Sequence, residues 1–321
     1  MPPTEGAPAP DPGTSEAAHA GWSRRRILKV GLGGVAAVVV AGAAGAELVA
    51  YGVIPGKQRL DQLDGACSMA ATSLTSAATG PSRSGTFYSK ARQRSVGYTV
   101  AYPPGHAQGS VLPLVVMLHG FGGNHRTALS SMTPAQAVAL EVDGRPLAPM
   151  AMATVDGGGG YWNPHPGDDP MGMVIDELIP MCQGMGLGRP PQGIGTMGIS
   201  MGGYGALLLA ERYPHLIGAV AAISPAVWTS YDEAQAANAG AYSSSASFRA
   251  NDAVTHAGSL SGTPVRVASG DDDPFHSGVE ALARALPPDA VVTFSHGCHT
   301  GPFFSSQEPP SLAFLAQHLA G

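Results

Sequence analysis

The sequence is poor in charge, and this scarcity excludes several classes of protein. Only 12% of the 321 residues are charged, about half the usual share. Because 44% are hydrophobic, the chain can bury a sizeable core and does not have the composition of a disordered protein. Acidic residues outnumber basic ones by 23 to 17, and no basic stripe is present to neutralise phosphates. We therefore expect no nucleic-acid partner.

Cysteine is also scarce. Cys67, Cys182 and Cys298 are too few for a disulfide scaffold, and no C-x-x-C pair is present. In an oxidising compartment the three allow one disulfide and one free thiol, and the sequence does not select the pair. The 44 glycines and 28 prolines follow no three-residue period, which excludes collagen.

The N-terminus has the composition of a targeting segment. Residues 1–23 are rich in Pro, Ala and Gly and are expected to be disordered in the cytoplasm. The stretch S-R-R-R-I-L-K at 23–29 precedes an uncharged run and an A-G-A exit at 44–46. This order is typical of an export signal, and S-R-R-x-x-x-K resembles the twin-arginine signal, which exports folded proteins. We expect residues 24–46 to direct the protein out of the cytoplasm, to the cell envelope or beyond.

A membrane anchor is the alternative for this region. Residues 30–54 are long enough to span a bilayer and would then form a membrane tether. The positive residues precede the apolar run, so the bulk of the chain lies outside the cytoplasm in either case. Residues 47–85 are Ala/Ser/Gly-rich and are predicted to be a linker.

From residue 86 to residue 321, strands alternate with helices. Short apolar runs predict buried strands at 112–118, 147–155, 194–199, 218–223, 264–268 and 290–295. Helical patterns occupy 171–182, 205–213, 278–286 and 311–319. The alternation predicts an α/β domain with a mostly parallel central sheet and helices on both faces.

A nucleophile motif lies between one predicted strand and the following helix. Gly198-Ile199-Ser200-Met201-Gly202 is a G-x-S-x-G sequence. A sharp strand-to-helix turn exposes the serine hydroxyl, and small neighbours let the two chains pass closely. Ser200 is therefore the predicted nucleophile.

The loop after the 112–118 strand is suited to stabilising an oxyanion. It has the sequence H-G-F-G-G-N at 119–124. In such folds this loop donates one backbone N–H and the residue after the nucleophile donates another. The candidates are the N–H groups of Phe121 and Met201, while His119 is expected to be a structural hydrogen-bonding residue.

Two late loops supply an acid and a base. Serine needs a base to take its proton, and that base needs a carboxylate to orient it. After the 264–268 strand comes G-D-D-D-P-F at 270–275, and after the last strand comes H-G-C-H-T at 296–300. Both follow Ser200 in the order serine, acid, histidine.

Together these motifs resemble the esterase D family of α/β-hydrolases, which includes S-formylglutathione hydrolases and secreted mycolyltransferases. The resemblance rests on G-I-S-M-G-G-Y-G-A-L-L-L-A, G-D-D-D-P-F and G-C-H-T-G-P-F-F. It implies a single α/β-hydrolase domain without a large separate cap. The family patterns G-x-x-D-x-F and G-x-H-[ST]-x-x-[FY] select Asp273 as the acid and His299 as the base. The family likeness around Asp156 and Trp162 implies a site wall, with Trp162 as a substrate-binding residue.

The expected function is hydrolysis of a small-molecule or lipid carboxylic ester through an acyl-enzyme intermediate. No cofactor is needed, and no metal is expected, because one aspartate turn and one H-G-C-H stretch supply too few ligands. One alternative is an acyltransferase, similar to the mycolyltransferases, that moves acyl chains onto envelope sugars. A second is a non-catalytic envelope binding protein on the same fold.

Overall fold

The structure is a computed structural model that describes residues 67–69, 80–129, 136–137, 140–142 and 145–319. The predicted disordered segment (1–23), export signal (24–46) and membrane tether (30–54) lie outside the described residues, as does most of the 47–85 linker. None of the helices in the described part of the chain has the length and hydropathy needed to span a membrane.

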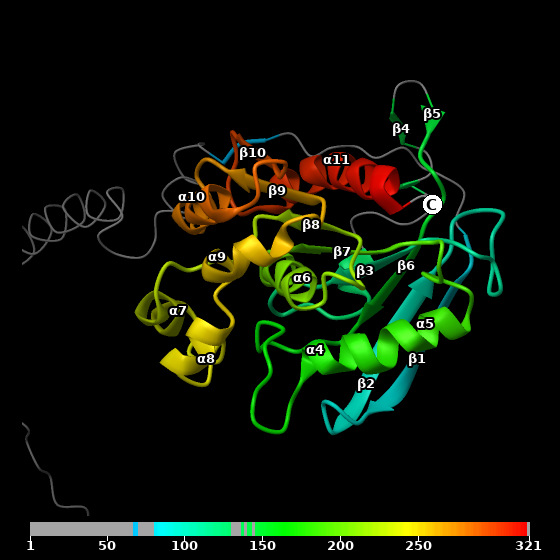
Figure 1. Ribbon diagram of the computed structural model, residues 1–321, viewed down its shortest axis with the longest axis horizontal. Coiled ribbons are helices and arrows are strands. Elements are labelled where there is room, and N and C mark those ends of the chain that lie inside the picture. Colours follow the sequence, from blue (N-terminus) through cyan, green and yellow to red (C-terminus); the bar gives the residue numbers. More distant parts are fainter. Residues whose placement is uncertain (1–66, 70–79, 130–135, 138–139, 143–144, 320–321) are drawn as a thin grey trace, which may run out of the picture. The chain divides into compact units, whose positions relative to one another are not determined.

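Eight strands form one sheet in the order β1-β2-β6-β3-β7-β8-β9-β10 (Figure 1). The strands are β1 (Ser82–Ser89), β2 (Arg94–Ala101), β3 (Leu114–Leu118), β6 (Ala151–Val155), β7 (Ile194–Ile199), β8 (Ala219–Ile223), β9 (Val265–Gly270) and β10 (Val291–Ser295). The pairs from β6 to β10 are parallel, whereas β1 and β2 pair antiparallel with each other and β2 with β6. The predicted mostly parallel sheet is confirmed.

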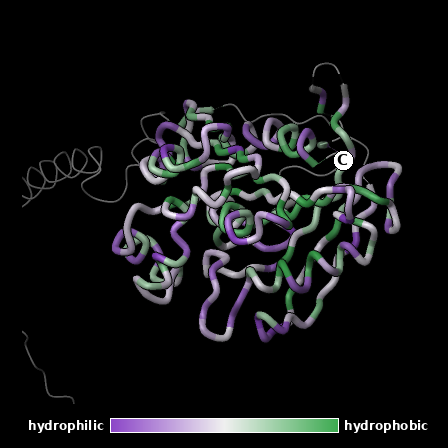
Figure 2. Tube along the Cα trace, viewed as in Figure 1, coloured by the Kyte–Doolittle hydropathy of each residue, from purple (hydrophilic) through white to green (hydrophobic). Residues whose placement is uncertain are grey.

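The central strands are buried on both faces because both faces carry apolar side chains. In β3, Leu114 and Val116 belong to one apolar cluster, whereas Val115 and Met117 belong to a second. This alternation is the two-residue period of a strand. In Figure 2 the hydrophobic residues gather on these strands. Such burial on both sides requires helices over each face.

The helices divide between the two faces. They are α4 (Pro170–Met173), the π-helical η2 (Val174–Leu178), α5 (Ile179–Gly184), α6 (Met201–Arg212), α7 (Tyr231–Ala237), α8 (Ser245–Ala250), α9 (Ala253–His256), the 3₁₀ turns η1 (Thr127–Leu129) and η3 (Ala257–Leu260), α10 (His276–Ala285) and α11 (Gly301–Leu319). Helices α4, α5, α6 and α10 contribute to the first cluster, and α11 contributes Phe303, Leu312 and Leu315 to the second.

Two helices differ from the sequence prediction. Helix α11 begins at Gly301 rather than near residue 311 and contains Pro309 and Pro310. Prolines normally end a helix, but here packing of its apolar face on the sheet overrides the local preference. The predicted 171–182 helix is split by the π-helical η2, which comes just before Pro180, where a missing N–H interrupts the hydrogen-bond ladder.

The segment between β8 and β9 folds as the short helices α7, α8 and α9, which the sequence did not predict. Its aromatic side chains pack together: Trp228 and Tyr242 lie 6.1 Å apart between ring centroids, and Tyr242 and Phe248 lie 5.1 Å apart. The short strands β4 (Glu141–Val142) and β5 (Arg145–Pro146) precede β6 in the chain and form a separate two-stranded antiparallel sheet. The loops that follow β3, β7, β9 and β10 leave the same edge of the parallel sheet, and the candidate site lies there.

Candidate active site

Ser200 lies at the turn between β7 and α6 in a backbone conformation that residues other than glycine rarely adopt. Its φ is 57° and its ψ is −121°. The turn is possible because residues 198 and 202 lack side chains: a Cβ on Gly198 would overlap with the backbone of Gly202, and one on Gly202 would overlap with the carbonyl oxygen of Leu118. Close packing therefore holds a strained residue in place, as is common at functional sites.

His299 lies in the loop between β10 and α11 and reaches the serine. Its Nε2 is 2.8 Å from the Oγ of Ser200. This is the distance across which an imidazole can take a hydroxyl proton. The other histidine of this loop, His296, is exposed to solvent. The structure thus brings His299 to Ser200, as the family pattern implies.

Asp273 lies behind the imidazole, in the loop between β9 and α10. Its Oδ2 is 2.9 Å from Nδ1 of His299, and its Oδ1 accepts a 2.9 Å hydrogen bond from the N–H of Phe275. The carboxylate side chain is fully buried. Asp271 is exposed and Asp272 is half-buried, so Asp273 is the aspartate that the fold brings to the base.

Two aromatic rings flank the imidazole. The rings of Phe275 and Phe304 lie 5.2 Å and 4.9 Å from that of His299, both in edge contacts. These contacts restrict the rotation of the imidazole around the line to Asp273. Sequence reasoning did not assign either phenylalanine, although both belong to stretches that carried the family resemblance.

The loop after β3 passes directly beside the serine. A Cβ on Gly120 would stand 3.8 Å from the Cβ of Ser200. Met201 is the first residue of α6, and the first N–H groups of a helix have no intrahelical partner. The loop that contains Phe121 therefore passes close to Ser200, and Met201 follows Ser200 at the start of α6. Their role as oxyanion donors stays a prediction.

A pocket of about 530 Å³ opens beside the hydroxyl, a size typical of sites for small molecules. Its lining includes Met117, Leu118, Phe121, Ala128, Ile199 and Phe304, together with Ser200 and His299. The sequence did not indicate Ala128 or Phe304 as lining residues, because the pocket joins segments that are far apart in the chain.

His119 has a structural role, as expected. Its Nε2 accepts a 2.9 Å hydrogen bond from the N–H of Gly157, and its Nδ1 lies 2.8 Å from the carbonyl oxygen of Gly120. Since an N–H only donates and a carbonyl only accepts, Nδ1 carries the proton. Burial lowers the pKa of the His119 imidazole, which keeps it neutral. Both ring nitrogens are occupied, so His119 does not compete with His299.

Trp162, the predicted substrate-binding residue, is buried in the core instead of lining the pocket. The side chain is 1% exposed and is absent from the residues that line the pocket in the described part of the chain. Its ring lies 5.1 Å from that of His119, and its Nε1 donates a 3.3 Å hydrogen bond to the His119 carbonyl. The structure therefore corrects the expectation: Trp162 packs against His119 at the start of the loop after β3, and its ring fills the space beside Gly157 and Gly205.

The described residues bring no group of three or more His, Cys, Asp or Glu side chains together in a way that could hold a metal ion. The site consists of a hydroxyl, an imidazole and a buried carboxylate in series, at the start of helix α6. This arrangement activates a serine and stabilises the charge that develops when it attacks a carbonyl.

The comparison with protein families identifies an esterase. A protein-family model described as "Putative esterase" matches residues 89–287, more than half of the chain. A search among curated proteins finds none that matches.

Several solved structures are similar in fold. A ferulic acid esterase superposes with a TM-score of 0.65 at 20% identity, covering 75% of this chain and 99% of its own. An S-formylglutathione hydrolase from Agrobacterium tumefaciens gives 0.60 at 18% identity, with 78% and 100% covered. The fluorophosphonate-binding serine hydrolase F from Staphylococcus aureus gives 0.58 at 15%, with 74% and 99% covered. The fold is therefore that of the α/β-hydrolases. Because the "Putative esterase" family model matches more than half of the chain, the chain belongs to that family.

Proposed function

We propose that the chain is a serine carboxylesterase in which Ser200 is the nucleophile, His299 the general base and Asp273 the residue that orients the base. One observation carries the proposal: the 2.8 Å and 2.9 Å contacts that link the three side chains in series. A serine hydroxyl is a weak nucleophile until a neighbouring base takes its proton.

The reaction proceeds in two acyl transfers. Nε2 of His299 takes the proton of Ser200, and Oγ attacks the ester carbonyl to give a tetrahedral intermediate. The N–H groups of Phe121 and Met201 bind its oxyanion, with about 3 kcal/mol of stabilisation from each donor. The intermediate collapses, and His299 returns the proton to the departing alcohol. Water, deprotonated by the same imidazole, then releases the acid and regenerates Ser200.

The pocket favours a neutral ester with an apolar or aromatic acyl group. Its walls are formed mainly by apolar side chains, including Met117, Ile199 and Phe304. No lysine or arginine is among the lining residues that the structure describes, so nothing there pairs with the carboxylates of glutathione. Similar solved structures include S-formylglutathione hydrolases and ferulic acid esterases. The lining agrees better with the aromatic ester.

We also propose that the enzyme acts outside the cytoplasm. The S-R-R-x-x-x-K stretch at 23–29 supports export by the twin-arginine pathway. The disulfide between Cys67 and Cys298 supports it independently, because disulfides persist mainly in oxidising compartments. Replacing Arg24 and Arg25 by lysine should leave the protein in the cytoplasm, and unchanged export of that variant would exclude this route.

Hydrolysis of p-nitrophenyl acetate tests the nucleophile. We expect Ser200→Ala to lose turnover almost completely while its circular dichroism stays that of the wild type. Ser305→Ala, which removes a hydroxyl one helical turn past the His299 loop, is the matched control and should remain active. Turnover retained in Ser200→Ala would end the assignment.

Three further substrates test the specificity. We expect methyl ferulate to be hydrolysed with a higher kcat/KM than S-formylglutathione. An assay with an acyl donor and a trehalose-like acceptor tests transfer against hydrolysis, and free acid should remain the main product. A dominant acylated sugar would make the enzyme an acyltransferase instead.

A further inference from the structure

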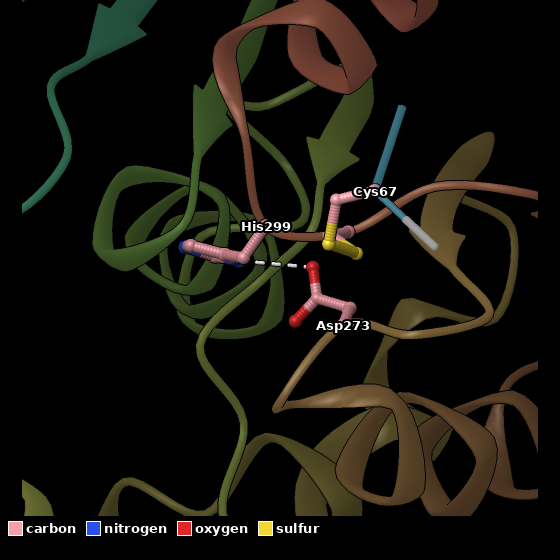
Figure 3. The surroundings of a disulfide bond; sticks show 4 residues. Cys67, Asp273 and His299 are labelled. Atoms are coloured by element: carbon pink, nitrogen blue, oxygen red, sulfur yellow. Dashed lines mark hydrogen bonds and ion pairs between the residues drawn. A yellow bond between two sulfur atoms is a disulfide. The ribbon is translucent and has the colours of Figure 1, made fainter. Parts of the chain in front are cut away.

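The base loop is tied to a distant part of the chain. A disulfide joins Cys298, the residue immediately before His299, to Cys67, 231 positions earlier in the sequence, with 5.2 Å between the two Cα atoms. Figure 3 shows the disulfide directly beside the hydrogen-bonded pair of His299 and Asp273. Cys67 lies before the first strand of the sheet, so the bond joins the base to the segment that leads into the domain.

The loop that carries His299 lies at the edge of the sheet. It follows β10, the last of the described strands of the sheet, which pairs there with β9. No residue of β10 is fully buried, in contrast to β7 and β8. The main chain of the loop is held by a 3.0 Å hydrogen bond from the Asp272 N–H to the Gly297 carbonyl and by a 2.8 Å bond from the Thr300 N–H to the Cys298 carbonyl.

The segment at 67–69 covers the loop as well as bonding to it. A Cβ on Gly297 would stand 2.7 Å from Sδ of Met69, and Met69 packs against the apolar cluster that contains Phe303. Cys298 itself is completely buried. The disulfide and the Met69 contact therefore both hold residues 297 and 298.

We propose that the Cys67–Cys298 disulfide is a positioning device for the general base, and that its reduction lowers the turnover rate without unfolding the domain. This inference rests on the proposed function, because it assigns the imidazole of His299 as the base. The imidazole must keep two contacts at once, to Ser200 and to Asp273. A displacement of about 1 Å at such a contact costs on the order of a hundredfold in rate.

The device makes activity depend on the compartment. A signal that exports folded proteins delivers this domain with both thiols reduced. Outside the cytoplasm, the thiolate of one cysteine attacks an external disulfide, forming a mixed disulfide and releasing one external thiolate. The second cysteine thiolate then displaces the other external thiolate, and the Cys67–Cys298 bond forms. The external disulfide accepts two electrons, and its two released thiolates take up the two protons that the cysteines lose. The esterase gains its full rate only at that point.

Reduction of the full-length wild-type enzyme tests the inference. With p-nitrophenyl acetate, treatment with a phosphine reductant should lower kcat about tenfold to a hundredfold. We expect KM to change less than about twofold, since the pocket is formed mostly by the loops after β3 and β7. Circular dichroism should be unchanged, and oxidised glutathione should restore kcat. Loss of the folded spectrum on reduction would show a stability role instead and would overturn the inference.

Variants separate this disulfide from other thiol effects. Cys67→Ser should have the kcat of the reduced enzyme and should not respond further to reductant or to oxidised glutathione. Cys182→Ser, which removes the buried free thiol, should behave as the wild type does. A kcat in Cys67→Ser equal to that of the wild type would overturn the inference about the disulfide but leave the proposed esterase function intact. An oxidised wild type that hydrolyses no ester would refute the proposed function, and the inference with it.

Discussion

The loops after β3 and β7, here called the nucleophile half, differ from the loops after β9 and β10, the base half, in how they are held. In the nucleophile half, backbone packs on backbone: Gly202 leaves no room for a Cβ beside the Leu118 carbonyl. The base half also has one close backbone contact, between Gly270 and Gly297. Its imidazole, however, is held by side chains, namely Asp273 and the rings of Phe275 and Phe304, and its loop by a disulfide. The difference follows from position, since β7 lies inside the sheet and β10 at its edge.

The comparison teaches that different kinds of substitution disturb the geometry of the two halves. The nucleophile half is sensitive to atoms added at Gly198 and Gly202, because its geometry comes from close backbone packing at these two residues. The base half is sensitive to the loss of individual side-chain contacts and to reductant, because these replace the packing that an edge strand lacks. Four substitutions test this contrast.

The largest effect is expected in the base half. Asp273→Asn should lower kcat by about 10⁴ with little change in folding, because the amide no longer holds the imidazole in the productive tautomer. Asp271→Asn, at an exposed position two residues earlier, is the control and should retain nearly full activity. Steady-state kinetics measures both, and the reverse order of effects would move the acid to Asp271.

The next effect is expected in the nucleophile half. Gly202→Ala should reduce activity by about a hundredfold and lower the free energy of unfolding by about 1–3 kcal/mol, because the added methyl group forces the end of β3 away from α6. Gly301→Ala is the control at an open position after the base loop, where a Cβ meets nothing within 4 Å. Denaturant unfolding measures both variants. Equal tolerance of the two substitutions would remove the contrast between the halves.

A smaller effect is expected at the mouth of the pocket. The Phe121 side chain is 63% exposed and lines the pocket, while its backbone N–H is the proposed oxyanion donor. Phe121→Ala keeps the N–H and removes the ring, so KM for methyl ferulate should rise about tenfold with kcat nearly unchanged. Phe294→Ala removes a partly exposed ring on β10 and should alter neither constant. A fall in kcat instead would give the ring a part in the chemical step.

The smallest effect concerns pH. Burial lowers the pKa of His119 in the folded state from its ordinary 6.5. Below about pH 6.5 the unfolded chain therefore binds a proton that the folded protein does not, and stability falls as pH falls toward the folded pKa. His119→Gln should have a lower Tm than the wild type at pH 8, and the difference should narrow toward pH 5. Exposed His296→Gln is the control, and a constant difference across this range would contradict the assignment of a neutral imidazole.

Much of this arrangement could be predicted from the sequence. The apolar runs that became β3, β7 and β8 are buried on both faces, so their composition alone marks them as strands. Ser200 was identified because the elbow needs small residues at fixed spacing. The choice of Asp273 and His299 needed the family pattern, since three aspartates and two histidines lie within reach along the chain.

The remainder depends on long-range packing. Phe304 lines the pocket only because α11 starts ten residues earlier than its prolines suggest, and Trp162 turns inward because two glycines leave it space. The partner of Cys298 lies 231 residues away, and no local preference of the chain encodes such a pairing. These features arise from tertiary contacts that override or go beyond local propensity.

Labelling with a fluorophosphonate, followed by mapping of the modified peptide, tests the central claim most directly, since the probe reacts only with an activated serine. The oxidised wild type should carry one adduct, on Ser200, and labelling should be far slower in His299→Ala. An adduct on a different serine, or no adduct on a folded and oxidised enzyme, would contradict the account.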